Sequence, residues 1–176
     1  MSRHFLTIIL ILAAATSVCG QADSVKWRRT FWFDLGVGPG KNGLAINGSF
    51  NFEVKRNWMM SLQTDQIDET DDTGSTSCPD KINSGGVSFL VGRLIKKKRG
   101  VFLISAGPSV IDLHHNPCTN VLAEQYHQTS FGVHISGQAF ITSRHFGVGI
   151  NPFANINDKR SYYGVTLNLA VGRFAR

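Results

Sequence analysis

Two side chains that could carry out hydrolysis lie close together in the second half of the chain. His134 and Ser136 supply an imidazole base and a hydroxyl nucleophile, and on a strand both would project from the same face. A nucleophilic serine also needs a group that orients its base. The chain has no Glu after Glu124, and its only later acid is Asp158. The pair remains an alternative hypothesis, and we assign no catalytic residue from the sequence.

Clustered carboxylates are the second candidate for chemistry. Carboxylate oxygens bind Ca²⁺, but the spacing here matches no EF-hand loop. Charge runs of this kind are usually solvated. The sequence therefore favours an exposed loop over about 66–84 and assigns no metal. Half of the twelve acidic residues belong to this cluster, with Lys81 as its one base: Asp65, Asp68, Glu69, Asp71, Asp72 and Asp80.

A second polar segment, about 113–128, combines histidines with a cysteine. His114, His115, Cys118 and His127 are all of types that bind Zn²⁺. Their spacing corresponds to no known zinc finger. We therefore assign no metal to this segment and no cofactor anywhere in the chain. For Cys118 we consider a disulfide instead.

The first twenty residues have the pattern of a secretory signal peptide. Arg3 and His4 form a polar start, residues 5–15 are apolar apart from Thr7, and small residues follow through Ala22. The apolar stretch is too short for a membrane-spanning helix, which needs about 20 residues. We therefore expect residues 1–20 to be a signal peptide and residues 21–176 to form a single domain.

Export decides how the cysteines are interpreted. Cleavage after Gly20 or after Ala22 fits the pattern equally well. Lipidation of Cys19 is a further alternative, although Thr16 stands where a lipobox usually has Leu. Signal removal leaves Cys78 and Cys118 in a compartment that permits oxidation. We expect these two residues to form a disulfide.

Period-2 alternation of apolar and polar residues dominates the rest of the chain and predicts strands. No helical periodicity competes with it. The final segment is typical, because Tyr163, Val165 and Leu167 alternate with Gly164 and Thr166. Eight such segments are predicted, at about 30–38, 44–54, 58–65, 85–95, 101–112, 129–142, 145–156 and 162–171. An even number of consecutive strands indicates an antiparallel barrel.

The alternation alone fits two opposite barrels, one soluble with its apolar face inside and one embedded with its apolar face outside. The polar face favours the embedded barrel, because it is rich in small and amide residues rather than Lys and Glu. These residues are Gly36, Gly38, Asn47, Ser49, Asn51, Gly147, Gly149, Asn151, Gly164, Asn168 and Gly172. Aromatic residues at the predicted strand ends suggest interfacial girdles: Trp27, Trp32, Trp58, Tyr126, Tyr162 and Tyr163.

The connections between strands alternate in length and charge. Those at 55–57, 96–100 and 143–144 are tight and basic, whereas two of the others are the long segments 66–84 and 113–128. Bacterial membrane barrels have short periplasmic turns and longer external loops. A soluble lipocalin-type barrel has no reason for this sidedness. The pattern therefore predicts an embedded barrel whose basic turns face the periplasm.

The inward face of such a barrel carries several polar and charged groups. We predict that a polar network in the lumen includes Asp34, Asn47, Glu53, His134 and Gln138, and we also place Lys55 on this face. Leu90, Leu94 and Leu103 depart from the alternation because they fall on the polar face. An eight-stranded barrel has an interior just filled by side chains, so a wide pore is not expected.

The net charge of +6 does not indicate nucleic-acid binding. The basic residues gather at the predicted periplasmic turns and do not form a stripe interleaved with aromatic side chains. Charged residues make up only 17% of the chain. We expect the basic end to meet anionic lipid head groups.

The mature chain resembles the small eight-stranded outer-membrane β-barrels of Gram-negative bacteria, the OmpA/OmpX-like superfamily. Its last strand, from Tyr163 to Leu169, looks like the C-terminal signal read by the barrel-insertion machinery. A departure is the ending, where Phe174 is followed by Ala175 and Arg176. Some barrels of this kind are lipid A deacylases with a His and a Ser two positions apart, but Gly137 stands here where they have Asn.

The sequence thus predicts an all-β protein, an eight-stranded antiparallel up-and-down transmembrane β-barrel in the outer membrane. Its expected role is structural or in surface interaction, without enzymatic activity. Its expected partners are outer-membrane lipids and, during biogenesis, the insertion machinery. We expect a monomer that binds no nucleic acid. The alternatives are a lipid A deacylase-like enzyme and a secreted, soluble lipocalin-like binding barrel.

Overall fold

The computed structural model describes residues 29–71, 80–116 and 126–174. These residues form eight antiparallel strands, as the alternation predicted. The strands are β1 (Phe31–Gly40), β2 (Gly43–Lys55), β3 (Trp58–Asp71), β4 (Asp80–Lys97), β5 (Gly100–Asn116), β6 (Tyr126–Thr142), β7 (Phe146–Asn157) and β8 (Tyr162–Arg173). Within the described ranges, no helix has the length and apolar character needed to cross a membrane.

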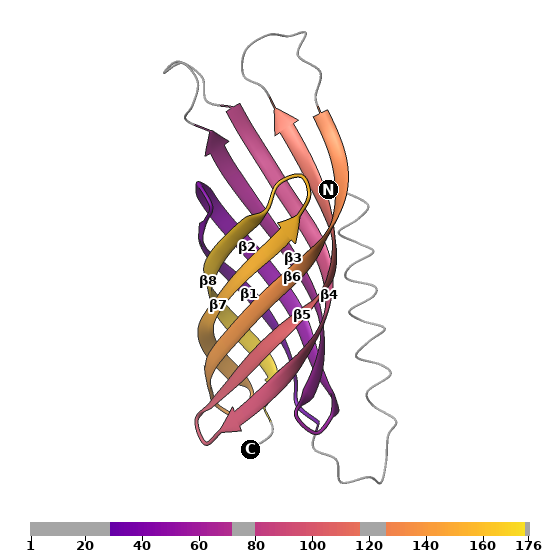
Figure 1. The fold of residues 1–176 in the computed structure, drawn as a ribbon. Coiled ribbons are helices and arrows are strands. Elements are labelled where there is room, and N and C mark those ends of the chain that lie inside the picture. The colour runs from indigo at the N-terminus through magenta and orange to yellow at the C-terminus, as the bar shows by residue number, and fades with distance from the viewer. Residues whose placement is uncertain (1–28, 72–79, 117–125, 175–176) are drawn as a thin grey trace, which may run out of the picture.

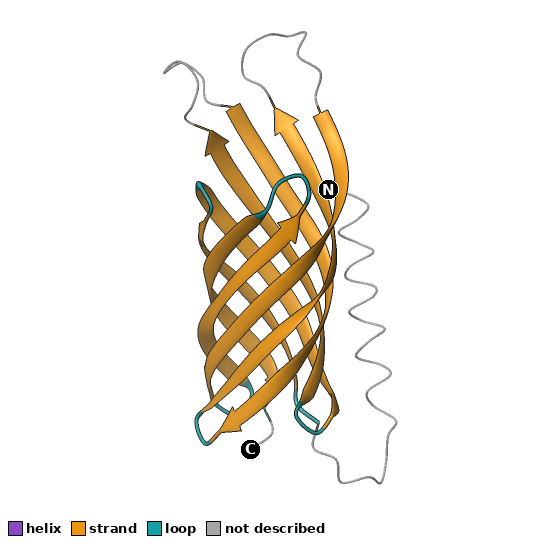
Figure 2. Ribbon diagram, viewed as in Figure 1, coloured by secondary structure: helices purple, strands orange, loops and turns teal. Residues whose placement is uncertain are grey.

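Each strand pairs with its sequence neighbours, and β1 pairs with β8 to close the barrel (Figure 2). Where all eight strands are paired, closure satisfies the backbone N–H and C=O groups internally and leaves no sheet edge. Tight turns join the strands at one end, which we call the inner end. Asn57 adopts a positive φ of 65° in the β2–β3 turn there, a conformation that Asn tolerates better than most residues. Asn42 does the same, at φ 56°, in the β1–β2 turn at the opposite, outer end.

The barrel is taller on one side than on the other. Strands β3 to β6 rise beyond the rest at the outer end, whereas the β1–β2 and β7–β8 turns lie lower (Figure 1). Pairing of β3 with β4 continues to Asp71 and Asp80, and pairing of β5 with β6 reaches His115 and Tyr126. The predicted loops 66–84 and 113–128 were therefore too long. Polar segments there still form strands, because ladder bonds use the backbone and not the side chains.

The two faces of the wall differ in the way the alternation predicted. Apolar side chains cover the outside, and small or polar ones point inward. The largest exposed apolar groups come from every strand and include Leu35, Ile46, Leu62, Phe89, Ile104, Phe131, Ile150 and Leu167. This outer belt is the surface that a lipid bilayer covers.

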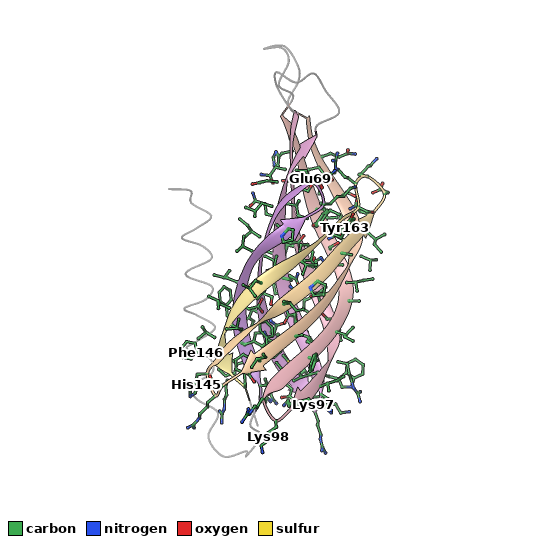
Figure 3. All side chains as sticks on the ribbon, turned by 90° about the vertical axis from the view of Figure 1, so that its left-hand side faces the viewer. Glu69, Lys97, Lys98, His145, Phe146 and Tyr163 are labelled. Carbon is green, nitrogen blue, oxygen red and sulfur yellow. The ribbon has the colours of Figure 1, made fainter. Side chains whose placement is uncertain are left out.

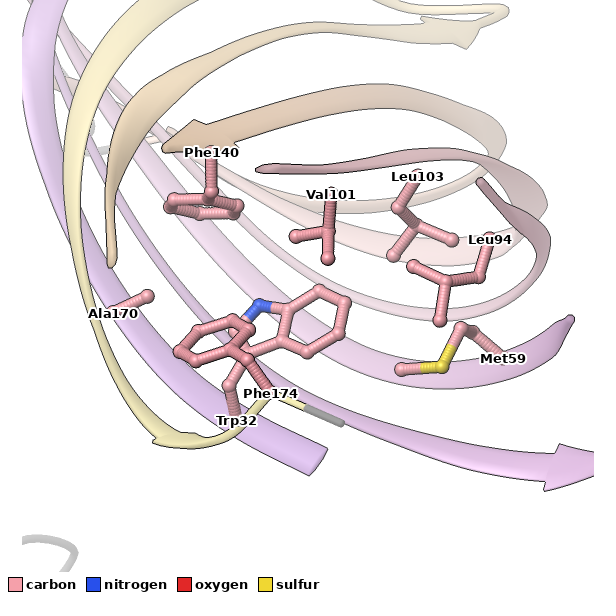
Figure 4. Close-up of a cluster of buried hydrophobic side chains, with 8 residues drawn as sticks. All are labelled: Trp32, Met59, Leu94, Val101, Leu103, Phe140, Ala170 and Phe174. Carbon is pink, nitrogen blue, oxygen red and sulfur yellow. The ribbon is translucent and has the colours of Figure 1, made fainter. Parts of the chain in front are cut away.

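Three leucines that broke the predicted pattern keep the strict alternation of the wall and point inward. Leu90, Leu94 and Leu103 are buried. Leu94 and Leu103 belong to an apolar cluster that fills the inner part of the lumen (Figure 4). The cluster consists of Trp32, Met59, Leu94, Val101, Leu103, Phe140, Ala170 and Phe174. An inward-facing position is thus not always polar, because a narrow lumen can be closed by apolar packing.

Two aromatic residues predicted for the interfacial girdles lie elsewhere. Trp32 is buried in the inner apolar cluster, where its ring stacks on Phe174 with centroids 5.5 Å apart. Tyr162 is buried in a second cluster nearer the outer end. Trp58 and Tyr163 do face outward. The girdle prediction was wrong for the first pair because a strand-end position does not decide which face a side chain occupies; the parity within the strand does.

Candidate functional site in the lumen and at the barrel ends

The centre of the lumen holds a hydrogen-bonded network around Asp34, which is fully buried. Its carboxylate accepts hydrogen bonds from Ser49 Oγ at 2.5 Å and Asn168 Nδ2 at 2.6 Å. It also accepts bonds from Asn51 Nδ2 at 3.0 Å and Trp32 Nε1 at 3.1 Å. A buried carboxylate is tolerated when donors surround it in this way. Asp34 therefore organises side chains from β1, β2 and β8.

Asn47 and Gln138 extend this network in the positions expected of them. Asn168 Nδ2 and Thr166 Oγ1 each donate to Asn47 Oδ1 at 3.1 Å. Gln138 Nε2, on β6, donates across the lumen to Ser49 Oγ at 3.1 Å. The bonds cross between strands that are far apart in the sequence, so the network ties opposite walls of the barrel together.

Close packing accompanies the network. A Cβ atom added at Gly36 would come within 2.6 Å of Asn47 Oδ1 and would overlap the Asn168 side chain. The small residues on the inward face are therefore needed for the amide groups to fit. Packing of this density leaves the centre of the lumen filled by side chains, as expected for eight strands.

Glu53 lies at the inner end, apart from this network. It forms an ion pair with Lys96 Nζ at 2.6 Å and accepts backbone bonds from Thr30 at 3.0 Å and Asn57 at 3.1 Å. Lys55, which we expected in the lumen, is exposed instead. The reason is a register shift between Glu53 and Lys55, a β-bulge that turns Lys55 to the outer face.

His134 belongs to a separate buried group nearer the outer end. Its Nδ1 lies 3.5 Å from Asp65 Oδ1 and 3.4 Å from Asn155 Nδ2, and its ring stacks on Phe153 with centroids 5.8 Å apart. The Tyr162 hydroxyl donates a hydrogen bond to the other oxygen of Asp65. The predicted lumen residues thus divide into three groups: the central network, the inner ion pair and this His134 group.

The predicted lumen network did not include Asp65, Tyr162 or Glu69. Asp65 was predicted at the end of the strand at about 58–65 and counted with the acidic cluster, and Glu69 was assigned to the loop that follows; both are buried on the inward face of β3. Arg160, in the β7–β8 turn, donates to Glu69 Oε2 at 2.5 and 3.1 Å and closes the outer end. The signal was available, because Gln63, Asp65 and Glu69 continue the parity of the earlier inward residues of the same strand.

The hydrolase hypothesis finds no support in the geometry. His134 and Ser136 are 0% and 1% exposed, and both point into the lumen rather than to the membrane. Ser136 Oγ donates to Asn151 Oδ1 at 2.8 Å, whereas the described contacts of His134 involve Asp65, Asn155 and Phe153. A lipid substrate cannot reach a side chain in this position, and within the described ranges the serine has no hydrogen bond to a base.

The remaining candidates from the sequence are the two polar segments, the cysteine pair and the signal peptide. Among the residues that the structure describes, no group of three or more His, Cys, Asp or Glu side chains could hold a metal ion. Asp112 and His114 lie 3.2 Å apart on the exposed outer part of β5. Cys78 and Cys118 fall outside the described residues, so their disulfide stays a prediction. The signal peptide over 1–20 lies outside them as well.

Charge is distributed unevenly between the two ends of the barrel. Lys97 and Lys98 lie at the inner end, and Glu69 lies near the outer end (Figure 3). Ten basic residues occupy the inner turns and strand ends, against Glu53 as the one acid in this described region. They are Arg29, Lys55, Arg56, Arg93, Lys96, Lys97, Lys98, Arg99, Arg144 and Arg173. Among these ten, Lys96 alone forms an ion pair within the described part of the chain.

The barrel resembles several solved structures, although its sequence matches no known family. No family model and no curated protein matches the sequence. The barrel is similar to the N-terminal β-barrel domain of Pseudomonas aeruginosa OprF, with a TM-score of 0.62 and 9% identity over 81% of this chain and 96% of that one. It is also similar to Neisserial surface protein A, with a TM-score of 0.57 and 10% identity over 84% and 97% of the two chains.

A third similar structure is Ail, the attachment invasion locus protein of Yersinia pestis. Its TM-score is 0.55 at 10% identity, with 83% of this chain and 97% of that chain covered. At such identities the likeness concerns the fold. Together with the closed lumen and the apolar outer belt, it means that the chain has the fold of the small eight-stranded outer-membrane β-barrels.

Proposed function

We propose that this outer-membrane barrel is a non-enzymatic, monomeric protein that presents a rigid surface for interaction outside the cell. The observation that carries the proposal is the raised wall of β3 to β6, which extends beyond the rest of the barrel at the outer end. Strands held by a continuous backbone ladder form a more rigid binding surface than loops do. A purely structural role would not require one side of the barrel to be taller.

The filled lumen supports this proposal and argues against a diffusion channel. The inner ion pair, the inner apolar cluster, the Asp34 network and the Glu69–Arg160 pair follow one another along the barrel axis. Each group joins side chains from different strands. Their combined effect is a stiff barrel that supports the raised wall.

The charge of the raised wall indicates the chemistry of its partner. Asp65 and Glu69 point inward, but Asp68 is exposed on the outer face of β3. Asp71 and Asp80 are ladder partners where β3 and β4 end. The acidic residues in this part of β3 and β4 favour a basic partner. One Ail structure contains the heparin analogue sucrose octasulfate, a polyanion that these carboxylates would repel.

Adhesion of bacteria that display the barrel tests this proposal. We expect them to bind wells coated with histone, a basic protein, and not wells coated with heparin. The double variant Asp68→Asn with Asp71→Asn should lower binding to histone. Asp158→Asn, a carboxylate on the low β7–β8 turn, is the matched control and should leave binding unchanged. Equal binding to both coatings, or an undiminished double variant, would refute a role for the raised wall.

A further inference from the structure

The β-bulge at the inner end creates an arrangement that the alternation of the sequence conceals. In the β2–β3 ladder Glu53 pairs with Met59, but the next pair is Lys55 with Trp58. Val54 is therefore the additional residue of the bulge. Residues directly opposite each other in a ladder project from the same face. Lys55 consequently shares the outer face with the exposed Trp58.

A second cation flanks the same tryptophan on its other side. Trp58 pairs with Arg93 of β4, and the Arg93 guanidinium carbon lies 5.5 Å from the centroid of the Trp58 ring. Neighbouring strands are about 4.8 Å apart, so about 10 Å of sheet separates the backbones of Lys55 and Arg93. The result is a row of cation, indole and cation across three adjacent strands.

This row lies at the inner edge of the apolar belt. Toward the outer end, β4 presents Val91 and Phe89 to the outside, with exposures of 46% and 45%. Toward the inner end lies the basic turn at Lys98 and Arg99. A guanidinium is far more costly at the bilayer midplane than at the interface. Indole rings prefer the same interfacial level. Both preferences place the row at the lipid head groups.

We propose that Lys55 and Arg93 bind the phosphate of an anionic glycerophospholipid, with Trp58 packed at the level of its glycerol group. The inference rests on the outer-membrane location in the proposed function. The planar guanidinium matches a phosphate with two parallel hydrogen bonds, and the Lys55 ammonium adds a mobile point charge. The cation–π contact holds the guanidinium in place before the lipid arrives.

The surrounding charge makes an anionic lipid a better occupant than a zwitterionic one. Among the described residues, the inner end carries ten bases, and its one acid there, Glu53, is already paired with Lys96. A zwitterionic head group brings its own cation into this field and neutralises its phosphate. Phosphatidylglycerol brings no cation, so its full negative charge is available to the row.

Native mass spectrometry of the folded barrel, in an equimolar mixture of phosphatidylglycerol and phosphatidylcholine, measures this preference. We expect the wild-type barrel to retain more phosphatidylglycerol. The double variant Lys55→Gln with Arg93→Gln should lose about five-fold in relative affinity for each charge removed. Arg144→Gln with Arg173→Gln removes the same charge from the inner end outside the row, and it should keep most of the preference.

Heat-modifiable migration shows whether each sample is folded. It therefore distinguishes a failure of the proposed outer-membrane function from a failure of the lipid site alone. A wild-type barrel that does not fold in lipid contradicts the outer-membrane function itself. A folded wild-type barrel without preference overturns only the lipid site, as does an equal loss in both double variants, because the attraction would then be unspecific. If the row variant does not fold, Lys55→Gln and Arg93→Gln are measured singly, and each must lower the preference.

Discussion

Replacing Leu167 with Arg tests the assignment of the outer face most directly. Leu167 is 61% exposed on β8, and its ladder partners Val37 and Ile150 are also exposed and apolar. The outward-facing residues of β8 run from Tyr163 to Arg173. With about 3.4 Å per residue and a strand tilt of about 40°, this distance spans about 26 Å along the membrane normal.

That span agrees with the apolar band of about 25 Å seen in membrane barrels. By the same arithmetic Leu167 lies about 10 Å from the level of Tyr163, within a few ångström of the midplane. Arginine near the midplane costs about 2–4 kcal/mol of folding free energy, whereas near an interface it costs about 0–1 kcal/mol. Val171→Arg, about 5 Å from the level of Arg173, is therefore the depth-matched control.

Urea unfolding of both variants in phospholipid vesicles measures these free energies. Unfolding can be followed by tryptophan fluorescence and by migration of unheated samples. We expect Leu167→Arg to be less stable than Val171→Arg by about 2 kcal/mol, which is about thirty-fold in the folding equilibrium. Equal costs for the two variants, or no cost for Leu167→Arg, would refute the assignment of this face to lipid.

Four further outcomes follow from the same structure. Asp34→Asn should destabilise the barrel by about 1–3 kcal/mol in the same unfolding assay, because an amide group would face side chains that already donate to this position; an unchanged midpoint would contradict the central network. If Cys78 and Cys118 form a disulfide, denaturing alkylation without reductant labels neither, and labelling of both would exclude the bond. The Ser130 hydroxyl donates to Asp158 at 2.7 Å and lowers the pKa of that carboxyl below its usual 3.8. The stabilisation from this bond is therefore complete above pH 3.8 and is lost as the pH falls through the lowered value; a carboxyl titration by NMR with a midpoint at or above 3.8 would disprove the effect. The closed barrel should also resist SDS until boiled, and identical migration before and after boiling would argue against it.

The amino-acid sequence by itself determined the number of strands, their faces and the sidedness of the turns. The prediction succeeds because side chains alternate between the two faces of a strand, and in a membrane barrel one face meets lipid and the other packs in the lumen. The inward positions of Asp34, Asn47 and Gln138 follow from that parity alone. Turn length and basic charge are equally local properties, so the inner end could be identified without coordinates.

Only the tertiary structure decided the position of the bulge, the contacts between distant strands and the ends of the strands, because the alternation of side chains along a strand does not determine them. A single bulge moved Lys55 from the lumen to the outer face, and nothing in the sequence marks the position where a ladder gains a residue. Barrel closure brought Asp65 and His134 together from β3 and β6, although 69 positions separate them in the chain. The strand ends beyond residue 65 were also set by pairing partners, because backbone ladders continue where side-chain patterns fade. Contacts between distant strands depend on barrel closure and register, which are properties of the whole sheet.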